Sequence, residues 1–210
     1  GVSTFVMLST ESILSISVTT SLAKFGGDTA VGAMTVLTSI NQLMTMPLSG
    51  VCQGGQPLIS YNYGAKKFGR VKEAFFCQFF TCVGYTVVFW LVLMLFPNFF
   101  AGIFTSDVAL VDYTAWAIKV FLALGFSVGF QISCQQAFMA LGQAKISLIM
   151  ALLRKVFLLI PMIFILPHFF ANKTFAVFLA EPVSDIIAAA VTTFMFFRFF
   201  LRMLRENKSV

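Results

Sequence analysis

Three acidic residues stand inside long apolar stretches of this sequence, where a charge is costly. Glu11 lies in "LSTESILSIS", among hydroxyl side chains that include Ser15, and Glu181 and Asp185 lie in "AEPVSD". A charged side chain in the centre of a membrane costs about 2.5 to 3.5 kcal/mol on insertion scales, so it faces a cavity or a partner in most proteins. Burial also disfavours the charged form of a carboxyl group. We therefore predict that these acids bind and release a proton or Na⁺.

Glu181 and Asp185 are four residues apart, which places them on one face of a helix. Two acids at this spacing disfavour joint ionisation, and they titrate as a pair. Structural roles stay open at this point. Glu11 is also compatible with a neutral acid hydrogen-bonded to a neighbouring helix, and the Glu181–Asp185 pair is compatible with a cap near a helix end.

Amide side chains extend the polar character to two further apolar segments. Asn41 lies in one of them, and Gln131 and Gln135 fall within about one side of a helix in the other. Together with the acids, these amides predict the wall of a water-accessible cavity. The alternative is that they are hydrogen-bond partners between packed helices.

The composition indicates that these segments are membrane helices. The chain has 210 residues, of which 59% are apolar and 10% are charged. A soluble domain has about 25% charged residues, and so few charges would leave large apolar patches facing water. We predict an all-α, polytopic membrane protein, built as a bundle of six transmembrane helices.

Six segments reach the length of about 20 residues that a helix needs to cross a bilayer. They lie at residues 2–24, 30–61, 71–96, 120–141, 146–170 and 174–201, and they form one transmembrane lobe (1–201) with a basic cytoplasmic tail (202–210). Pro47 and Pro57 predict bends in the second segment, and Pro182 predicts one in the sixth. Residues 106–119, with Trp116, predict an interfacial helix that leads into the fourth segment.

Basic residues gather on one side of this predicted topology. The connection after the second segment carries four of them, Lys66, Lys67, Arg70 and Lys72. The positive-inside rule makes this side cytoplasmic, with both termini on it, and makes these residues topology anchors. Arg154 and Lys155 are expected to snorkel towards the same headgroups. Since the net charge of +6 is spread between apolar runs, we expect membrane lipid as a partner and no nucleic acid.

The sequence predicts neither an enzyme nor a metal site. All four cysteines lie in apolar segments without a CxxC spacing, and no HExxH motif is present. The single histidine, His168, falls at the outer end of the fifth segment. We expect no catalytic residues, no metal and no cofactor other than a coupling ion, H⁺ or Na⁺.

Several stretches in order resemble one lobe of the multidrug and toxic compound extrusion (MATE) transporters. They are "GGDTAVGAMTVLTSI" from Gly26, "QGGQPLISYNYGAKKFGRVKEA" from Gln53, "ALGQAKIS" from Ala140, "LLIPMIFILP" from Leu158 and "AEPVSD" from Ala180. The similarity covers nearly the whole chain, and the Gln53 stretch is the most specific. It implies the carboxy-terminal six-helix lobe of a twelve-helix protein, so an amino-terminal six-helix lobe becomes an expected partner.

The resemblance also implies a function. MATE transporters exchange H⁺ or Na⁺ for amphipathic, often cationic, drugs or metabolites by alternating access, in the plasma membrane or, for a bacterium, the inner membrane. A glutamate important in the sodium-coupled branch matches Glu11, whereas the aspartate of the fourth helix is replaced by Phe130 or Gln131. The coupling ion therefore stays open. The alternatives are a lipid-linked saccharide flippase of the same superfamily and an inactive, truncated lobe.

Overall fold

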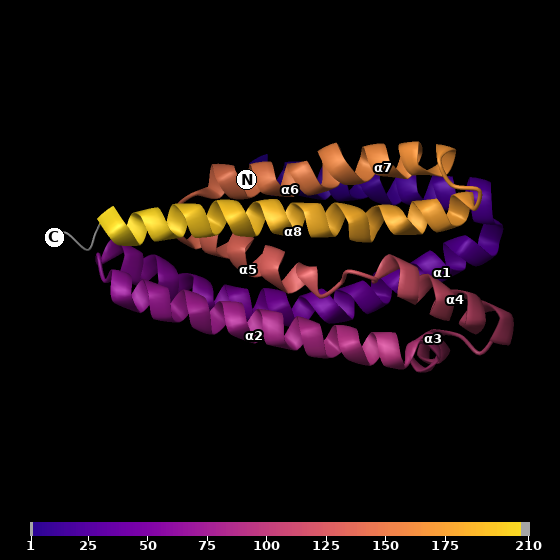
Figure 1. The fold of residues 1–210 in the computed structure, drawn as a ribbon, viewed down its shortest axis with the longest axis horizontal. Helices are drawn as coiled ribbons and strands as arrows, with labels where there is room; N and C mark the ends of the chain where they lie inside the picture. The colour runs from indigo at the N-terminus through magenta and orange to yellow at the C-terminus, as the bar shows by residue number, and fades with distance from the viewer. Residues whose placement is uncertain (1, 207–210) are drawn as a thin grey trace.

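The computed structural model describes the backbone of residues 2–206 and the side chains of residues 12–205, and all its regular elements there are helices. Helix α1 (Val2–Gly64) consists of two arms joined at Gly27, whose φ of 64° and ψ of −162° are not helical. Glycine reaches this region at no steric cost because it has no Cβ. Figure 1 shows the chain turning back there, so that the two arms run in opposite directions.

The middle of the chain forms four further helices. They are α2 (Phe68–Leu95), the short α3 (Pro97–Phe104), α4 (Val108–Phe121) and α5 (Ser127–Ala140). Asp107 caps α4 by accepting a hydrogen bond from the backbone N–H of Ala109 at 3.0 Å. The chain between α4 and α5 is held by Trp90, whose indole N–H donates to the carbonyl oxygen of Leu122 at 2.9 Å.

The last third of the chain forms two long, rod-shaped helical segments, which we call rods. The first is assembled from α6 (Ala144–Leu152), the π-helical turn η1 (Leu153–Leu159), α7 (Ile160–Ile165) and the 3₁₀ turn η2 (Leu166–His168). The second is α8 (Lys173–Glu206). Three helical stretches within the described residues are long and apolar enough to cross a membrane, Phe68–Leu95, Ala144–His168 and Lys173–Arg205. The all-helical membrane bundle expected from composition is confirmed.

Some boundaries differ from those expected. The fourth segment is not a continuous helix from 120 to 141, because turns separate α4 from α5 and α5 begins at Ser127. Residues 108–121 pack within the bundle, with Ile118 fully buried, instead of forming only an interfacial helix. Helix α8 continues past 201 to Glu206. Pro47 and Pro57 in α1 and Pro182 in α8 lie inside continuous helices, so the bends expected there stay predictions.

The two ends of the bundle carry different connections. Figure 1 shows the α1–α2 and α5–α6 connections at the end where α8 terminates, whereas the break in α1, α3 and the α7–α8 connection lie at the opposite end. The connection with Lys66, Lys67, Arg70 and Lys72 and the last turn of α8 with Arg205 thus share one end. We call it the basic end. Which side of the membrane it faces stays a prediction.

Phenylalanine makes up much of the core. Among the described side chains, five phenylalanines are almost fully buried: Phe75, Phe138, Phe178, Phe196 and Phe200. Without a hydrophobic drive between helices in lipid, close van der Waals packing holds membrane bundles together. Rings meeting between α2, α5 and α8 supply that packing near the basic end.

We predict that Gly129→Ala lowers stability by about 1 to 3 kcal/mol, the range for overpacking. A Cβ at Gly129 would lie 2.6 Å from Oγ1 of Thr86 and 3.0 Å from the carbonyl oxygen of Cys82, so α5 and α2 would have to separate. The measurement is the SDS concentration that unfolds the purified protein. The control, Gly84→Ala, meets nothing within 4 Å, and alanine there should stabilise helix α2 by up to about 1 kcal/mol. Equal effects of both changes would contradict this packing.

Candidate functional site

A polar cavity of about 780 Å³ lies between the arms of α1, the π-helical turn η1 and α8. Three hydroxyls on the second arm of α1, those of Thr35, Thr38 and Thr45, each donate to the carbonyl oxygen four residues earlier in the helix. Because these hydroxyl protons are already donated, the hydroxyl oxygens can act only as hydrogen-bond acceptors along the wall of the cavity. Among the residues whose side chains the structure describes, the charged ones in the lining are Arg154, Lys155 and Glu181.

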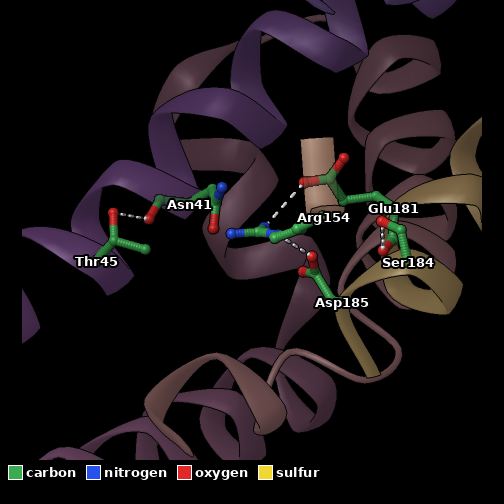
Figure 2. Close-up of polar contacts among 6 residues, drawn as sticks. All are labelled: Asn41, Thr45, Arg154, Glu181, Ser184 and Asp185. Carbon is green, nitrogen blue, oxygen red and sulfur yellow. Dashed lines mark hydrogen bonds and ion pairs between the residues drawn. The ribbon is translucent and has the colours of Figure 1, made fainter. Parts of the chain in front are cut away.

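One arginine joins both acids of α8 at the edge of this cavity. The Nη2 of Arg154 lies 3.3 Å from Oε1 of Glu181, and its Nε donates to Oδ1 of Asp185 at 2.6 Å. Figure 2 shows the guanidinium group between the two carboxylates, with the side chain of Asn41 pointing towards it from α1. We call Arg154, Glu181 and Asp185 the charge triad.

The π-helical turn explains how Arg154 comes to face α8. Pro161 has no backbone N–H, and its ring crowds the carbonyl group four residues earlier, which favours a wider turn before it. The N–H of Ile160 donates instead to the carbonyl oxygen of Lys155, five residues back. Such wide turns are frequent at functional sites in helices. Here the turn carries Arg154 and Lys155 to the cavity.

Helix α8 presents the acids because of their spacing. Glu181 and Asp185 share a face, and Ser184, whose hydroxyl donates to the carbonyl oxygen of Glu181 at 2.8 Å, lies beside them. Asp185 is 6% exposed. At 1.5 Å per residue, the acids lie about 12 to 18 Å along α8 from Lys173, and Arg154 lies about 15 Å along its rod from Ala144. The charge triad is thus far from both ends of the bundle.

The charges of the described side chains at this site balance each other. Two carboxylates face the guanidinium of Arg154, and Lys155 brings a second positive charge to the same cavity. The side chains of Arg154, Glu181 and Asp185 are 17%, 13% and 8% exposed. A charge removed from water to this degree is tolerated when it is paired. Another cation that binds these carboxylates therefore either displaces Arg154 or shares the carboxylates with it.

The residues predicted from the sequence fall into four groups. Ser15, Asn41 and Glu181 line the cavity, and Asp185 reaches it through Arg154. Glu11 belongs to helix α1, but its side chain is outside the described residues. The loop residues Lys66, Lys67, Arg70 and Lys72 are exposed at the basic end and do not line this cavity.

Gln131 and Gln135 do not line the cavity, which corrects our prediction. Helix α5 packs against α1, α2 and α8, and Figure 1 shows it between these helices, so its polar side is enclosed by the bundle. Gln131 is 1% exposed, and its Oε1 accepts no hydrogen bond from the side chains and backbone that the structure describes. Gln135 is half-buried.

The prediction that Arg154 is a headgroup anchor is wrong. Its guanidinium binds the two acids of α8 in the interior and does not reach for the basic end. A signal for this was present in the sequence, since a basic residue well inside an apolar segment has no ready partner except an acid at similar depth in another segment. Glu181 and Asp185 meet that requirement.

Comparisons with known proteins agree on one family. The sequence profile of the MatE family matches residues 4–165. The chain is 26% identical over 167 residues to the multidrug export protein MepA of Staphylococcus aureus (strain N315), and the match covers 79% of this chain and 37% of MepA. A MepA of Staphylococcus saprophyticus is 25% identical over 167 residues, with the same coverage of both chains.

Solved structures show the same fold. The MATE multidrug transporter DinF-BH superposes with a TM-score of 0.80 and 31% identity, over 94% of this chain and 44% of that protein. A MATE protein in its bent conformation gives a TM-score of 0.90 at 16% identity, over 99% of this chain and 46% of the other. The chain thus spans less than half the length of the relatives it matches.

These matches cover most of the chain and carry the names of transporters, not of enzymes. With the helical bundle and its enclosed charges, they lead to one conclusion: the chain belongs to the MatE family of membrane transport proteins.

Proposed function

We propose that this chain is one lobe, the carboxy-terminal one, of an antiporter that exports amphipathic, often cationic, drugs or metabolites in exchange for H⁺ or Na⁺. The observation that carries the proposal is the charge triad at the edge of the polar cavity. The family and the names of the relatives, a multidrug export protein and a multidrug transporter, support the class of substrate.

Arg154 acts in this proposal as a tethered counter-ion. When no other cation is bound, it neutralises Glu181 and Asp185 and keeps both carboxylates folded into the bundle. A proton, Na⁺ or cationic substrate displaces it from one carboxylate, and Arg154 returns when that cation leaves. Since only one of the competing cations can be bound to the freed carboxylate, binding of the coupling ion and of the substrate exclude each other. That exclusion is the requirement for exchange.

The lining of the cavity supports a partner lobe and an amphipathic substrate. Thr35, Thr38 and Gln42 are exposed on the second arm of α1, and polar side chains in this position are unsuited to face lipid. A second six-helix lobe opposite them would close the cavity, and rocking of the two lobes would alternate its access. Apolar lining residues such as Val31 and Phe121 would contact the hydrophobic part of the substrate.

One observation favours a second candidate function, transport of a lipid-linked saccharide. Arg154 and Lys155 both line the cavity, and a pair of cations suits the pyrophosphate of a lipid-linked saccharide. A flippase of the same superfamily therefore remains the alternative. It requires Arg154 to be available to the substrate, whereas the structure has its guanidinium bound to Glu181 and Asp185.

Gradient-driven efflux from proteoliposomes tests the proposal on the transporter that contains this chain. We expect Glu181→Gln and Asp185→Asn each to reduce efflux of a cationic dye by about tenfold or more, since a hydrogen bond to a charged group contributes about 1.5 to 3 kcal/mol. Glu11→Gln is expected to act in the same direction. The matched control is Glu73→Gln, which removes an exposed acid near the basic end and should leave efflux unchanged.

Two results would contradict the proposal. One is efflux, and its response to imposed H⁺ and Na⁺ gradients, that stays normal in both α8 variants. The other is a transporter that ignores cationic dyes but loses binding of a polyprenyl pyrophosphate after Arg154→Gln, which would favour the flippase. Imposing each gradient separately identifies the coupling ion.

A further inference from the structure

A second pocket, of about 590 Å³, lies at the basic end, between the beginning of α2 and the last turns of α8. It is separate from the charge triad and plays no part in the proposed exchange. Its lining consists of Lys66, Phe68, Gly69, Lys72, Phe76, Phe200, Leu201, Leu204 and Arg205. We propose that this pocket binds an anionic phospholipid, with the phosphate at its basic rim and the upper acyl chain on its aromatic floor.

The charged residues that the structure describes at the rim are all basic. Three basic residues line the pocket: Lys66 before α2, Lys72 in α2 and Arg205 in α8. The described lining contains no acidic residue. All three are exposed to solvent. Clusters of basic residues at the end of membrane helices attract anionic lipid headgroups, at about 1 kcal/mol for each Lys or Arg near the surface.

The floor of the pocket is an apolar surface that could contact the upper part of an acyl chain. Phe68 and Phe76 are half-buried and Phe200 is 1% exposed, and the rings of Phe76 and Phe200 are 6.5 Å apart. Helices α2 and α8, which carry these rings, are two of the helices long and apolar enough to cross a membrane. The pocket thus adjoins the hydrocarbon layer. An amphiphile fits both parts, whereas a free phosphate would contact the rim alone.

The backbone at Lys66 agrees with a role for its side chain. Lys66 has a φ of 58°, and its N–H donates to the carbonyl oxygen of Tyr63 while that of Lys67 donates to Asn62, which is the pattern that ends a helix with a left-handed residue. The equivalent position after α5 is Gly142, with a φ of 77°. Glycine is favoured in this conformation, so lysine at position 66 adopts it at a conformational cost.

Native mass spectrometry of the purified transporter, titrated with phosphatidylglycerol or phosphatidylcholine, tests the proposal. We expect tighter binding of phosphatidylglycerol, and a loss of about fivefold for each charge removed in Lys66→Gln/Lys72→Gln. The matched control is Lys67→Gln/Arg70→Gln, which removes the same charge from the same connection but outside the pocket, and should lose much less. Lys66→Arg/Lys72→Arg should retain binding.

A further variant separates binding from folding. Lys66→Gly keeps the left-handed turn and removes one ammonium group, so it should lose about fivefold in phosphatidylglycerol affinity without a lower unfolding midpoint. Three results would overturn the proposal: equal binding of the two lipids, equal losses in the pocket and control variants, or complete displacement of phosphatidylglycerol by inorganic phosphate. The last would assign a free-phosphate site.

Discussion

Replacing Arg154 with Gln is expected to destabilise this lobe by about 3 kcal/mol, because removal of one partner leaves buried charges unpaired. Glu181 and Asp185 both depend on its guanidinium, with contacts at 3.3 and 2.6 Å. The range for such changes is about 3 to 5 kcal/mol, and we expect the lower end because water still reaches the edge of the site. The measurement is the SDS unfolding midpoint of the purified protein.

The triple variant Arg154→Gln/Glu181→Gln/Asp185→Asn provides the matched test of this explanation. It removes all three charges and keeps similar side-chain volumes, so its stability should return to within about 1 kcal/mol of the native protein. Its efflux should be reduced by about tenfold or more, as in the single acid variants. A triple variant no more stable than Arg154→Gln alone would show that the arginine stabilises the lobe through packing and not through charge pairing.

The pairing itself shows where sequence reasoning reached its limit. The shared face of Glu181 and Asp185 follows from a spacing of four residues, which any helix converts into proximity. Their partner depends on how two helices are placed against each other. The π-helical turn that carries Arg154 changes the direction in which the neighbouring side chains point. A prediction that assumes a regular α-helix places these side chains on the wrong face.

Helix α5 illustrates the same limit. Its polar stripe can be seen in the sequence, but a stripe does not specify whether it faces water or another helix. In the structure Gln131 is enclosed, whereas Asn41 lines the cavity. By contrast, the break at Gly27 and the basic connection after α1 follow from local chemistry, glycine in one case and a cluster of charges in the other. Such features can be predicted without knowing which helices pack against each other.

The phenylalanine core leads to the second large effect, for Phe75→Ala. Phe75 is fully buried, and its ring centroid lies 4.6 Å from that of Phe196 and 5.0 Å from that of Phe200. Removal of a buried phenylalanine costs about 3 to 5 kcal/mol in water-soluble proteins. Part of that cost is transfer from water, which is absent in a bilayer. We therefore expect a loss of about 2 to 3 kcal/mol, from the cavity and the missing contacts alone.

Phe80→Ala is the matched control, on the same helix. Phe80 is 65% exposed, yet its ring lies 5.8 Å from Phe76 and 5.7 Å from Phe79, so both variants remove ring contacts and only one opens a cavity. A small loss for Phe80→Ala and a large one for Phe75→Ala, measured by SDS unfolding, would support packing as the force that joins α2 to α8. Equal losses would mean that ring contacts matter wherever they occur, and that the buried position of Phe75 adds nothing of its own.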